Sequence, residues 1–242
     1  MGITQLNFEN KTKVETAIGL IRAWEPPEGY YLAFSGGKDS VVLYDLTVKA
    51  GVKFDAHYCV SPIDPPQIYQ FIKEHYPNVQ WDYYARGWWK TVVKKGLPMR
   101  QSRWCCEVIK EAGGEGRVVL LGNRRDEGNI RKHQKCYEKA RSKDKFFVRP
   151  ILDFNTGEVW EYIRENNLPH CELYDKGFKR LGCILCPFSR EIKREMEYFP
   201  KTVKLWQLAC NRIVEARLTS GKEYKHQFET GEELFNWWVY RR

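Results

Sequence analysis

The sequence lacks the features that would direct the chain to a membrane or out of the cell. None of its apolar runs approaches the roughly 18 residues that a membrane-spanning helix needs, and residues 1–7 lack the charged-then-apolar layout of a signal peptide. We therefore expect a cytoplasmic protein without a membrane partner. Apolar residues make up 43% of the 242 positions, which is enough for one sizeable domain with an appended subdomain.

An export signal is missing from a chain that contains eight cysteines. Because the cytosol keeps thiols reduced, this combination argues against a disulfide framework and favours metal binding or thiol chemistry. Cys59 and Cys210 fall within strand and helix patterns, which indicates core packing. Cys136 lies in a basic segment and is a candidate reactive thiol.

Acidic residues are too few to balance the basic ones, and the net charge is +9. The excess is concentrated in residues 124–149, which contain ten Lys or Arg against four Asp or Glu. Such a surplus indicates a nucleic-acid target that contacts residues 124–149, although an anionic nucleotide explains it equally well. The simplest alternative is a solvated surface loop.

Strand and helix patterns alternate over most of the chain. Short apolar runs predict strands at 30–34, 54–60, 79–84, 117–121 and 146–151. Helices are predicted at 40–49, 65–75, 88–95 and 159–165. This order predicts an α/β fold with a parallel sheet, in which ligands bind beyond the carboxyl ends of the strands. Residues 35–40 and the segment after Leu121 are therefore expected to line one pocket.

The pattern changes near residue 188 to charged helices, predicted at 189–197 and 202–218. We therefore predict a nucleotide-binding domain over residues 1–187, which includes the clustered cysteines, and a helical cap over residues 188–242.

Two common phosphate-binding motifs are absent, the Walker loop and the dinucleotide Gly-x-Gly-x-x-Gly. In their place, residues 35–40 read Ser-Gly-Gly-Lys-Asp-Ser between a predicted strand and helix. Backbone N–H groups at a helix N-terminus bind anions, and glycines let the backbone approach the phosphate. Lys38 supplies a positive charge, and Asp39 orders the loop or helps to hold Mg²⁺. The alternative is a polar strand-to-helix turn. The candidate nucleotide-binding residues are Ser35, Gly36, Gly37, Lys38, Asp39 and Ser40.

These six residues match the PP-loop motif of ATP pyrophosphatases without a gap, and the chain resembles the phosphoadenosine-phosphosulfate (PAPS) reductase family of PP-loop enzymes. Residues 122–131 are similar to the family's Gly-x-Arg-x-x-Glu-Ser-x-x-Arg segment, with Gly128 in place of the serine. The resemblance implies an adenine nucleotide alpha hydrolase-like, Rossmann-like fold. It also implies that the loop grips the phosphates of ATP or of a sulfonucleotide, either PAPS or adenylyl sulfate (APS).

The resemblance extends to residues 150–153, 159–163 and 167–169, which are similar to the family's next block. It adds Gly122 and Arg124 to the nucleotide-binding residues, because an arginine fork pairs well with phosphate. The candidate catalytic residues that it implies are Lys38, Asp39, Arg124 and Arg131.

The remaining cysteines form an adjacent pair, Cys105 and Cys106, and a C-x-x-C, Cys183 and Cys186. By themselves they are compatible with a zinc site, a redox disulfide or core cysteines. The combination resembles the [4Fe–4S] ligand set of the family's assimilatory sulfonucleotide reductases, which implies a cluster on these four residues. Cys171 resembles a cysteine of the related ATP pyrophosphatase in DNA phosphorothioation systems and is a substitute fourth ligand.

The family resemblance leaves two reactions. In the first, a cysteine thiolate attacks the sulfur of PAPS or APS, and a thioredoxin-type partner then releases sulfite. In the second, the oxygen of a target attacks the α-phosphate of ATP, pyrophosphate leaves, and a sulfur donor displaces the adenylate.

The sequence lacks the C-terminal Glu-Cys-Gly-x-His motif in which the family's reductases carry their nucleophile, since its last cysteine, Cys210, is followed by Asn211. We therefore predict the ATP reaction. A third reading, from another class, is a nucleotide- or nucleic-acid-binding module without turnover, whose cysteines hold zinc. The presence of Lys38, Asp39, Arg124 and Arg131 together argues against passive binding.

Overall fold

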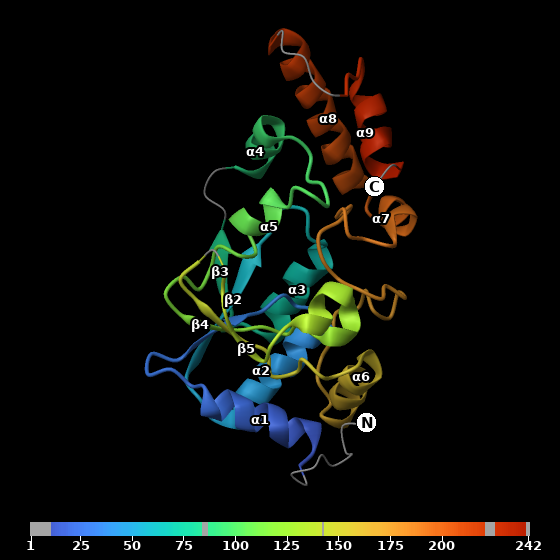
Figure 1. The fold of residues 1–242 in the computed structure, drawn as a ribbon. Helices are drawn as coiled ribbons and strands as arrows, with labels where there is room; N and C mark the ends of the chain where they lie inside the picture. Colours follow the sequence, from blue (N-terminus) through green and yellow to red (C-terminus); the bar gives the residue numbers. More distant parts are fainter. Residues whose placement is uncertain (1–10, 84–86, 142, 221–225, 241–242) are drawn as a thin grey trace. The chain divides into compact units, whose positions relative to one another are not determined.

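The computed structural model describes residues 11–83, 87–141, 143–220 and 226–240 (Figure 1). The predicted strand end at residue 84 and residue 142 of the basic segment lie outside them. The chain divides into two compact units. The first unit comprises Met1–Cys59, Pro66–Asp82 and Ala112–Leu181, and the second comprises Val60–Pro65, Tyr83–Glu111 and Gly182–Arg242. Among the described residues, no helix has the length and apolar character needed to cross a membrane.

The first unit is built on a six-stranded sheet with the order β3-β2-β1-β4-β6-β5. β1 pairs in parallel with β2 and β4, and β4 pairs in parallel with β6, whereas β5 runs antiparallel to β6. The predicted α/β class with a parallel sheet is confirmed, and the antiparallel edge strand β5 is an addition to it. In sheet order the strands are Gln80–Tyr83, Phe54–Val60, Tyr30–Ala33, Val118–Leu120, Phe146–Val148 and Tyr137–Lys139.

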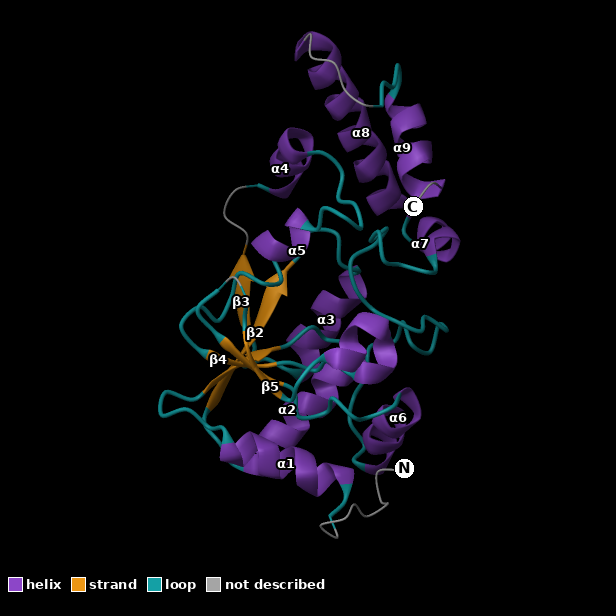
Figure 2. Ribbon diagram, in the orientation of Figure 1, coloured by secondary structure: helices purple, strands orange, loops and turns teal. Residues whose placement is uncertain are grey.

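One face of this sheet packs against helices (Figure 2). The Tyr30 hydroxyl on β1 donates to the Ile21 carbonyl of α1 at 2.8 Å. Tyr58 on β2 meets the ring of Tyr69 on α3 at a centroid distance of 5.8 Å. Since side chains alternate along a strand, the sequence neighbours of Tyr30 and Tyr58 point to the opposite face. The helices of the first unit are α1 (Lys13–Ala23), α2 (Lys38–Ala50), α3 (Pro66–His75) and α6 (Thr156–Glu165).

Capping boxes determine where α1 and α6 begin. The Thr12 hydroxyl accepts the Glu15 N–H, and the Glu15 carboxylate accepts the Thr12 N–H. Asn155 and Glu158 form the same pair of bonds at α6. Both boxes satisfy backbone donors that a helix start leaves unpaired. The Lys13 ammonium then joins the two helices through the Glu158 carboxylate at 2.8 Å.

The opposite face of the sheet carries a polar network around Tyr31. The Tyr31 hydroxyl donates to Asp82 at 2.9 Å, and the His57 ring stacks on Tyr31 at 4.2 Å and bonds both Asp82 and Asp55. Arg117 pairs with Asp55 through two nitrogens. Burial alone would raise the pKa of Asp55, but hydrogen bonds from Arg117 and His57 outweigh it and hold that pKa below its usual value.

The second unit is helical. Its core contains a cluster of tryptophans in which the rings of Trp206 and Trp238 lie 4.6 Å apart and those of Trp88 and Trp104 lie 5.3 Å apart. The Trp238 indole N–H donates to the Pro98 carbonyl at 2.8 Å. The helices are α4 (Trp88–Lys95), α5 (Trp104–Val108), α7 (Ile192–Tyr198), α8 (Pro200–Ser220) and α9 (Gly231–Tyr240).

The helices predicted over 189–197 and 202–218 correspond to α7 and α8. The predicted division into domains 1–187 and 188–242 stays a prediction. The compact units differ from it, because the unit that holds residues 188–242 also holds residues 60–65, 83–111 and 182–187, and with them both cysteine pairs.

A substitution in the loop before β4 tests how tightly this loop packs on Tyr31. A Cβ at Gly113 would lie 2.0 Å from the hydroxyl oxygen of Tyr31, and Tyr31 is only 5% exposed, so its ring has little room to move. We expect Gly113→Ala to lower the free energy of unfolding by about 1–3 kcal/mol through overpacking, measured by denaturant titration.

Gly19→Ala, in the middle of α1, is the matched control because no atom lies within 4 Å of the added Cβ. Alanine favours a helix over glycine, so this variant should be as stable as the wild type or more stable. Wild-type stability in Gly113→Ala would contradict the tight packing of Gly113 on Tyr31.

Candidate nucleotide-binding site

The loop between β1 and α2 is held by contacts within it. The Ser40 hydroxyl donates to the Gly37 carbonyl at 2.8 Å and accepts the Ser35 backbone N–H at 3.2 Å. Gly36 has a φ of +70°, which favours glycine, and a Cβ there would lie 3.0 Å from Ile68. Ser40 therefore braces the loop, and Gly36 allows its bend.

The N-cap residue of α2 provides no side-chain cap. Gly37 occupies the N-cap position and has no group to offer to the first-turn N–H groups. The aligned peptide dipoles give this end a partial positive charge. A strand, a glycine loop and an uncapped helix start form an arrangement that binds phosphate.

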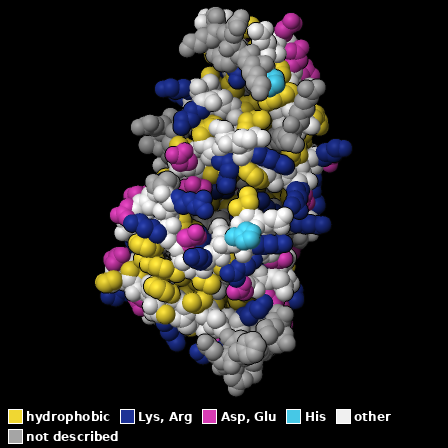
Figure 3. Space-filling model, in the orientation of Figure 1, with side chains coloured by type: hydrophobic (Ala, Val, Ile, Leu, Met, Phe, Trp, Pro, Cys, Tyr) yellow, Lys and Arg dark blue, Asp and Glu magenta, His cyan; other side chains and the backbone are white. Residues whose placement is uncertain are grey.

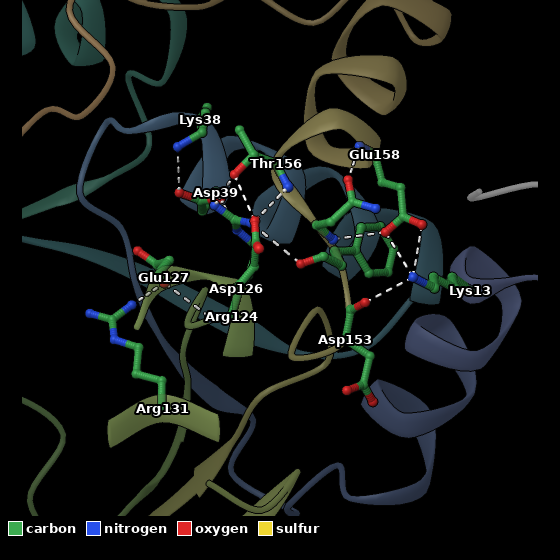
Figure 4. Close-up of polar contacts among 12 residues, drawn as sticks. Lys13, Lys38, Asp39, Arg124, Asp126, Glu127, Arg131, Asp153, Thr156 and Glu158 are labelled. Atoms are coloured by element: carbon green, nitrogen blue, oxygen red, sulfur yellow. Dashed lines mark hydrogen bonds and ion pairs between the residues drawn. The ribbon is translucent and has the colours of Figure 1, made fainter. Parts of the chain in front are cut away.

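Lys38 and Asp39 open α2 and pair with each other. The Lys38 side chain is 7% exposed, and its ammonium lies 3.1 Å from Oδ2 of Asp39. Oδ1 of Asp39 accepts from Nε of Arg124 at 2.6 Å. Asp39 thus bridges two cations (Figure 4). Both of its oxygens accept these hydrogen bonds, which is consistent with the predicted loop-ordering role, and a Mg²⁺ contact from Asp39 stays a prediction.

Arg124 is 2% exposed, and each of its three side-chain nitrogens donates to a protein acceptor. Besides Asp39, its guanidinium reaches Asp126 at 3.3 Å, the Phe154 carbonyl at 3.3 Å and the Thr156 hydroxyl at 3.3 Å. The Thr156 N–H and hydroxyl both donate to Asp126 at 3.0 and 2.9 Å, which lowers the pKa of Asp126. The segment after β4 is thereby fastened to the start of α6. A phosphate contact from Arg124 stays a prediction.

Gly122 and Arg131 lie at the two ends of that segment. A Cβ at Gly122 would lie 3.1 Å from the Asp39 carbonyl oxygen, so the segment after β4 and the start of α2 approach closely, as predicted. Arg131 pairs with Glu127, whose carboxylate also accepts the Arg124 N–H at 3.0 Å. At 30% exposure, Arg131 is far more accessible than Arg124 is.

Sequence reasoning missed Tyr174. Its hydroxyl accepts the Lys38 backbone N–H at 3.0 Å, and the Lys38 ammonium lies 5.8 Å from the centre of its ring. The distance of 136 positions between Tyr174 and the loop leaves no local pattern from which this contact could have been found.

The basic segment 124–149 carries less free charge than its composition implies. Five of its cations pair with carboxylates, and Lys145 is buried and donates to the Gly113 carbonyl at 2.7 Å. Exposed cations remain at Lys132, Lys135 and Arg141. Figure 3 shows Lys and Arg spread over much of the face in view.

Cys105 and Cys106 lie on α5 in the second unit. A hydrogen bond from the Cys105 thiol lowers the pKa of Cys106, and Arg103, whose Nη2 is 3.5 Å from Sγ of Cys106, lowers it further. Cys183 lies 3.6 Å from the Ser61 hydroxyl, and burial raises its pKa to about 12. The hydrogen bond with Cys106 and burial raise the pKa of Cys105, and a thiolate at Cys183 or Cys186 would raise it further.

The four sulfurs suit a thiolate-ligated centre by their chemistry. Their arrangement does not form a metal site, since in the ranges that the structure describes no three Cys, His, Asp or Glu side chains are grouped to hold a metal ion. The cluster therefore stays a prediction. Cys171 is buried and belongs to the first unit, and its role as a substitute ligand is also untested.

The sequence model of the phosphoadenosine phosphosulfate reductase domain matches residues 29–189, well over half of the chain. This range contains residues 35–40, residues 122–131 and all four cysteines of the predicted ligand set.

Proteins similar in sequence to this chain are named as different enzymes or as uncharacterized proteins. An uncharacterized protein of Methanocaldococcus jannaschii is 30% identical over 203 residues, which cover 76% of this chain and 42% of that protein. A probable FAD synthase of Schizosaccharomyces pombe is 30% identical, with 65% and 60% covered. An adenosine 5'-phosphosulfate reductase of Oceanobacillus iheyensis is 26% identical, with 64% and 69% covered. The chain spans about half the length of the first relatives that it matches.

Two solved structures share the fold at 18% identity. A phosphoadenylyl-sulfate reductase of Candida auris has a TM-score of 0.55 over 75% of this chain and 98% of that one. An FMN adenylyltransferase of Candida glabrata also has a TM-score of 0.55, over 76% and 72%. The chain therefore belongs to the phosphoadenosine phosphosulfate reductase family of PP-loop enzymes, with a nucleotide-binding domain of the adenine nucleotide alpha hydrolase-like fold.

Proposed function

We propose that the chain binds ATP at residues 35–40 and adenylates a target, with release of pyrophosphate, as the activating step of a sulfur transfer. An oxygen of the target attacks the α-phosphorus. The bond between that phosphorus and the bridging oxygen breaks, and pyrophosphate leaves with the electron pair. The site's task is to hold the triphosphate and to stabilise the charge that develops on the leaving group.

The observation that favours ATP over a sulfonucleotide is the burial of Cys210. A reductase needs an accessible thiolate to attack sulfur. Cys210 is 0% exposed in α8, and burial raises its pKa to about 12, so that it remains a thiol at neutral pH. The ATP reaction needs no such nucleophile.

Several loop residues have a part in this reaction. The Lys38 ammonium and the Asp39 N–H in the first turn of α2 bind phosphate oxygens, while the Lys38 N–H is bonded to the Tyr174 hydroxyl. Ser35 borders the site with its hydroxyl, which donates to Ser40. Arg124 and Lys38 fix Asp39, and so keep the start of α2 in position. Arg131, the more exposed arginine, is the better candidate for a phosphate contact. Mg²⁺ commonly accompanies nucleotide phosphates, but no step here depends on it.

We also propose a [4Fe–4S] cluster on Cys105, Cys106, Cys183 and Cys186. Support comes from the location of all four in one compact unit. A bound cluster supplies a redox-active iron–sulfur centre. Zinc on the same thiols is the alternative and belongs to the reading as a non-catalytic binding module.

The second candidate function is sulfonucleotide reduction. It is favoured by the relatives named adenosine 5'-phosphosulfate reductase and would take its nucleophile from Cys136 or a second protein. A thioredoxin-type protein is then the partner, whereas the ATP reaction takes a sulfur donor. A nucleic-acid target at residues 124–149 and a cytoplasmic location remain part of the proposal.

Lys38→Ala tests the ATP reaction. We expect a loss of ATP-dependent pyrophosphate release of roughly 100-fold or more, because a preorganised charge at the phosphates is removed. Lys204→Ala on the exposed face of α8 is the control for loss of a lysine, and Cys210→Ala should also retain activity. Sulfite release from APS with a thiol reductant, lost in Cys210→Ala or Cys136→Ala, would instead establish the reductase.

Cys183→Ser tests the cluster. Protein purified without oxygen should be brown and contain about four iron atoms per chain, and the variant should lose both colour and iron. Cys59→Ser, outside the ligand set, should keep them. A variant at Cys183 that retains its colour removes this residue from the ligands, and zinc in place of iron would refute the cluster.

A further inference from the structure

We propose that Tyr174 is a phosphate-binding residue of this site, with its hydroxyl donating to a phosphate oxygen of the bound nucleotide. The inference rests on the proposed function for the identity of the ligand. It assigns to the site a donor that lies outside the loop motif and outside residues 122–131.

The position of the hydroxyl is the first argument. It accepts the Lys38 N–H at 3.0 Å and therefore lies directly at the start of α2. A Cβ built on Gly37 would be 3.4 Å from the Tyr174 hydroxyl and 3.4 Å from the Ser35 hydroxyl. The open side of Gly37 is thus bordered by two hydroxyls, next to the buried Lys38 ammonium.

The second argument is hydrogen-bond capacity. A tyrosine hydroxyl accepts through its oxygen and donates one hydrogen. The oxygen of Tyr174 accepts from Lys38, and across the described part of the chain no acceptor is found for its hydrogen. Burial raises the pKa of Tyr174, so the hydroxyl keeps that hydrogen at neutral pH. An N–H that donates to a hydroxyl also polarises it, which makes the hydroxyl a stronger donor to an anion.

The third argument is that the ring is held in place. The Trp160 ring of α6 meets it edge-on at 5.0 Å. The Tyr174 N–H donates to the Cys171 carbonyl at 3.0 Å, and Cys171 and Leu173, which precede it in the chain, are 1% and 0% exposed. A side chain anchored in this way is suited to contact the ligand in place rather than to swing aside.

The opposing reading is that the hydroxyl occupies the place of a phosphate oxygen and must leave before the nucleotide binds. The two readings predict opposite signs. A phosphate ligand lost by Tyr174→Phe weakens nucleotide binding, whereas the loss of a competing acceptor frees the Lys38 N–H and strengthens it.

The test is calorimetric titration of wild type and Tyr174→Phe with ATP and with inorganic pyrophosphate. We expect Tyr174→Phe to bind both ligands roughly 10- to 100-fold more weakly, as for loss of a hydrogen bond to a charged group. Tyr198→Phe, at an exposed tyrosine, is the control and should bind as the wild type does.

Unchanged or tighter binding in Tyr174→Phe overturns the inference. Thermal unfolding without ligand provides the second measurement: a weaker-binding variant that also unfolds at a much lower temperature points to a structural role and likewise counts against it. Failure of the wild type to bind ATP or pyrophosphate refutes the proposed function itself, and is thereby distinguished from failure of the role of Tyr174.

Discussion

The geometry of the loop at residues 35–40 depends on the ion pair between Asp39 and Arg124. A guanidinium that is 2% exposed has lost its hydration, which costs several kcal/mol unless charged and polar partners replace the water. Asp39 supplies one of these partners from a position 85 residues away in the sequence. Any displacement of α2 from the segment after β4 would break the shorter of the two ion pairs of this buried charge, so the contact fixes the position of the loop.

Further contacts connect Arg124 to α6 and to Tyr174 within the first unit. Arg124 holds Asp126, and Asp126 caps the first residue of α6 through Thr156. α6 in turn carries Trp160, whose ring contacts Tyr174, and the Tyr174 hydroxyl returns to the start of α2. This chain of contacts therefore starts and ends at the same loop, residues 35–40. A site built in this way is preorganised, which is what electrostatic stabilisation of a leaving pyrophosphate requires.

Sequence patterns predicted what is local and failed where a contact is distant. The strand, glycine loop and α2 follow from adjacent residues, and the helix at 88–95 was predicted with the bounds of α4. β5 has three residues, two of them charged, too short to produce a strand pattern. The family resemblance predicted that Arg124 contacts a phosphate of the nucleotide. The burial of its side chain and its contacts with four protein groups could not be predicted, because they depend on tertiary packing. Tyr174 was missed for the same reason.

The pairing of charges affects which anions the site selects. Lys38 and Arg124 are matched by Asp39 and Asp126, and several cations of the basic segment are matched in the same way. An approaching anion therefore meets little net charge at the loop. What it meets are directed donors, namely the Lys38 ammonium, the Asp39 N–H and the Tyr174 hydroxyl beside Gly37, whose fixed positions suit phosphate oxygens. Selection by geometry rather than by net charge favours a nucleotide phosphate over an arbitrary polyanion. Such selection requires that the contacts through Arg124 hold the donors in fixed positions.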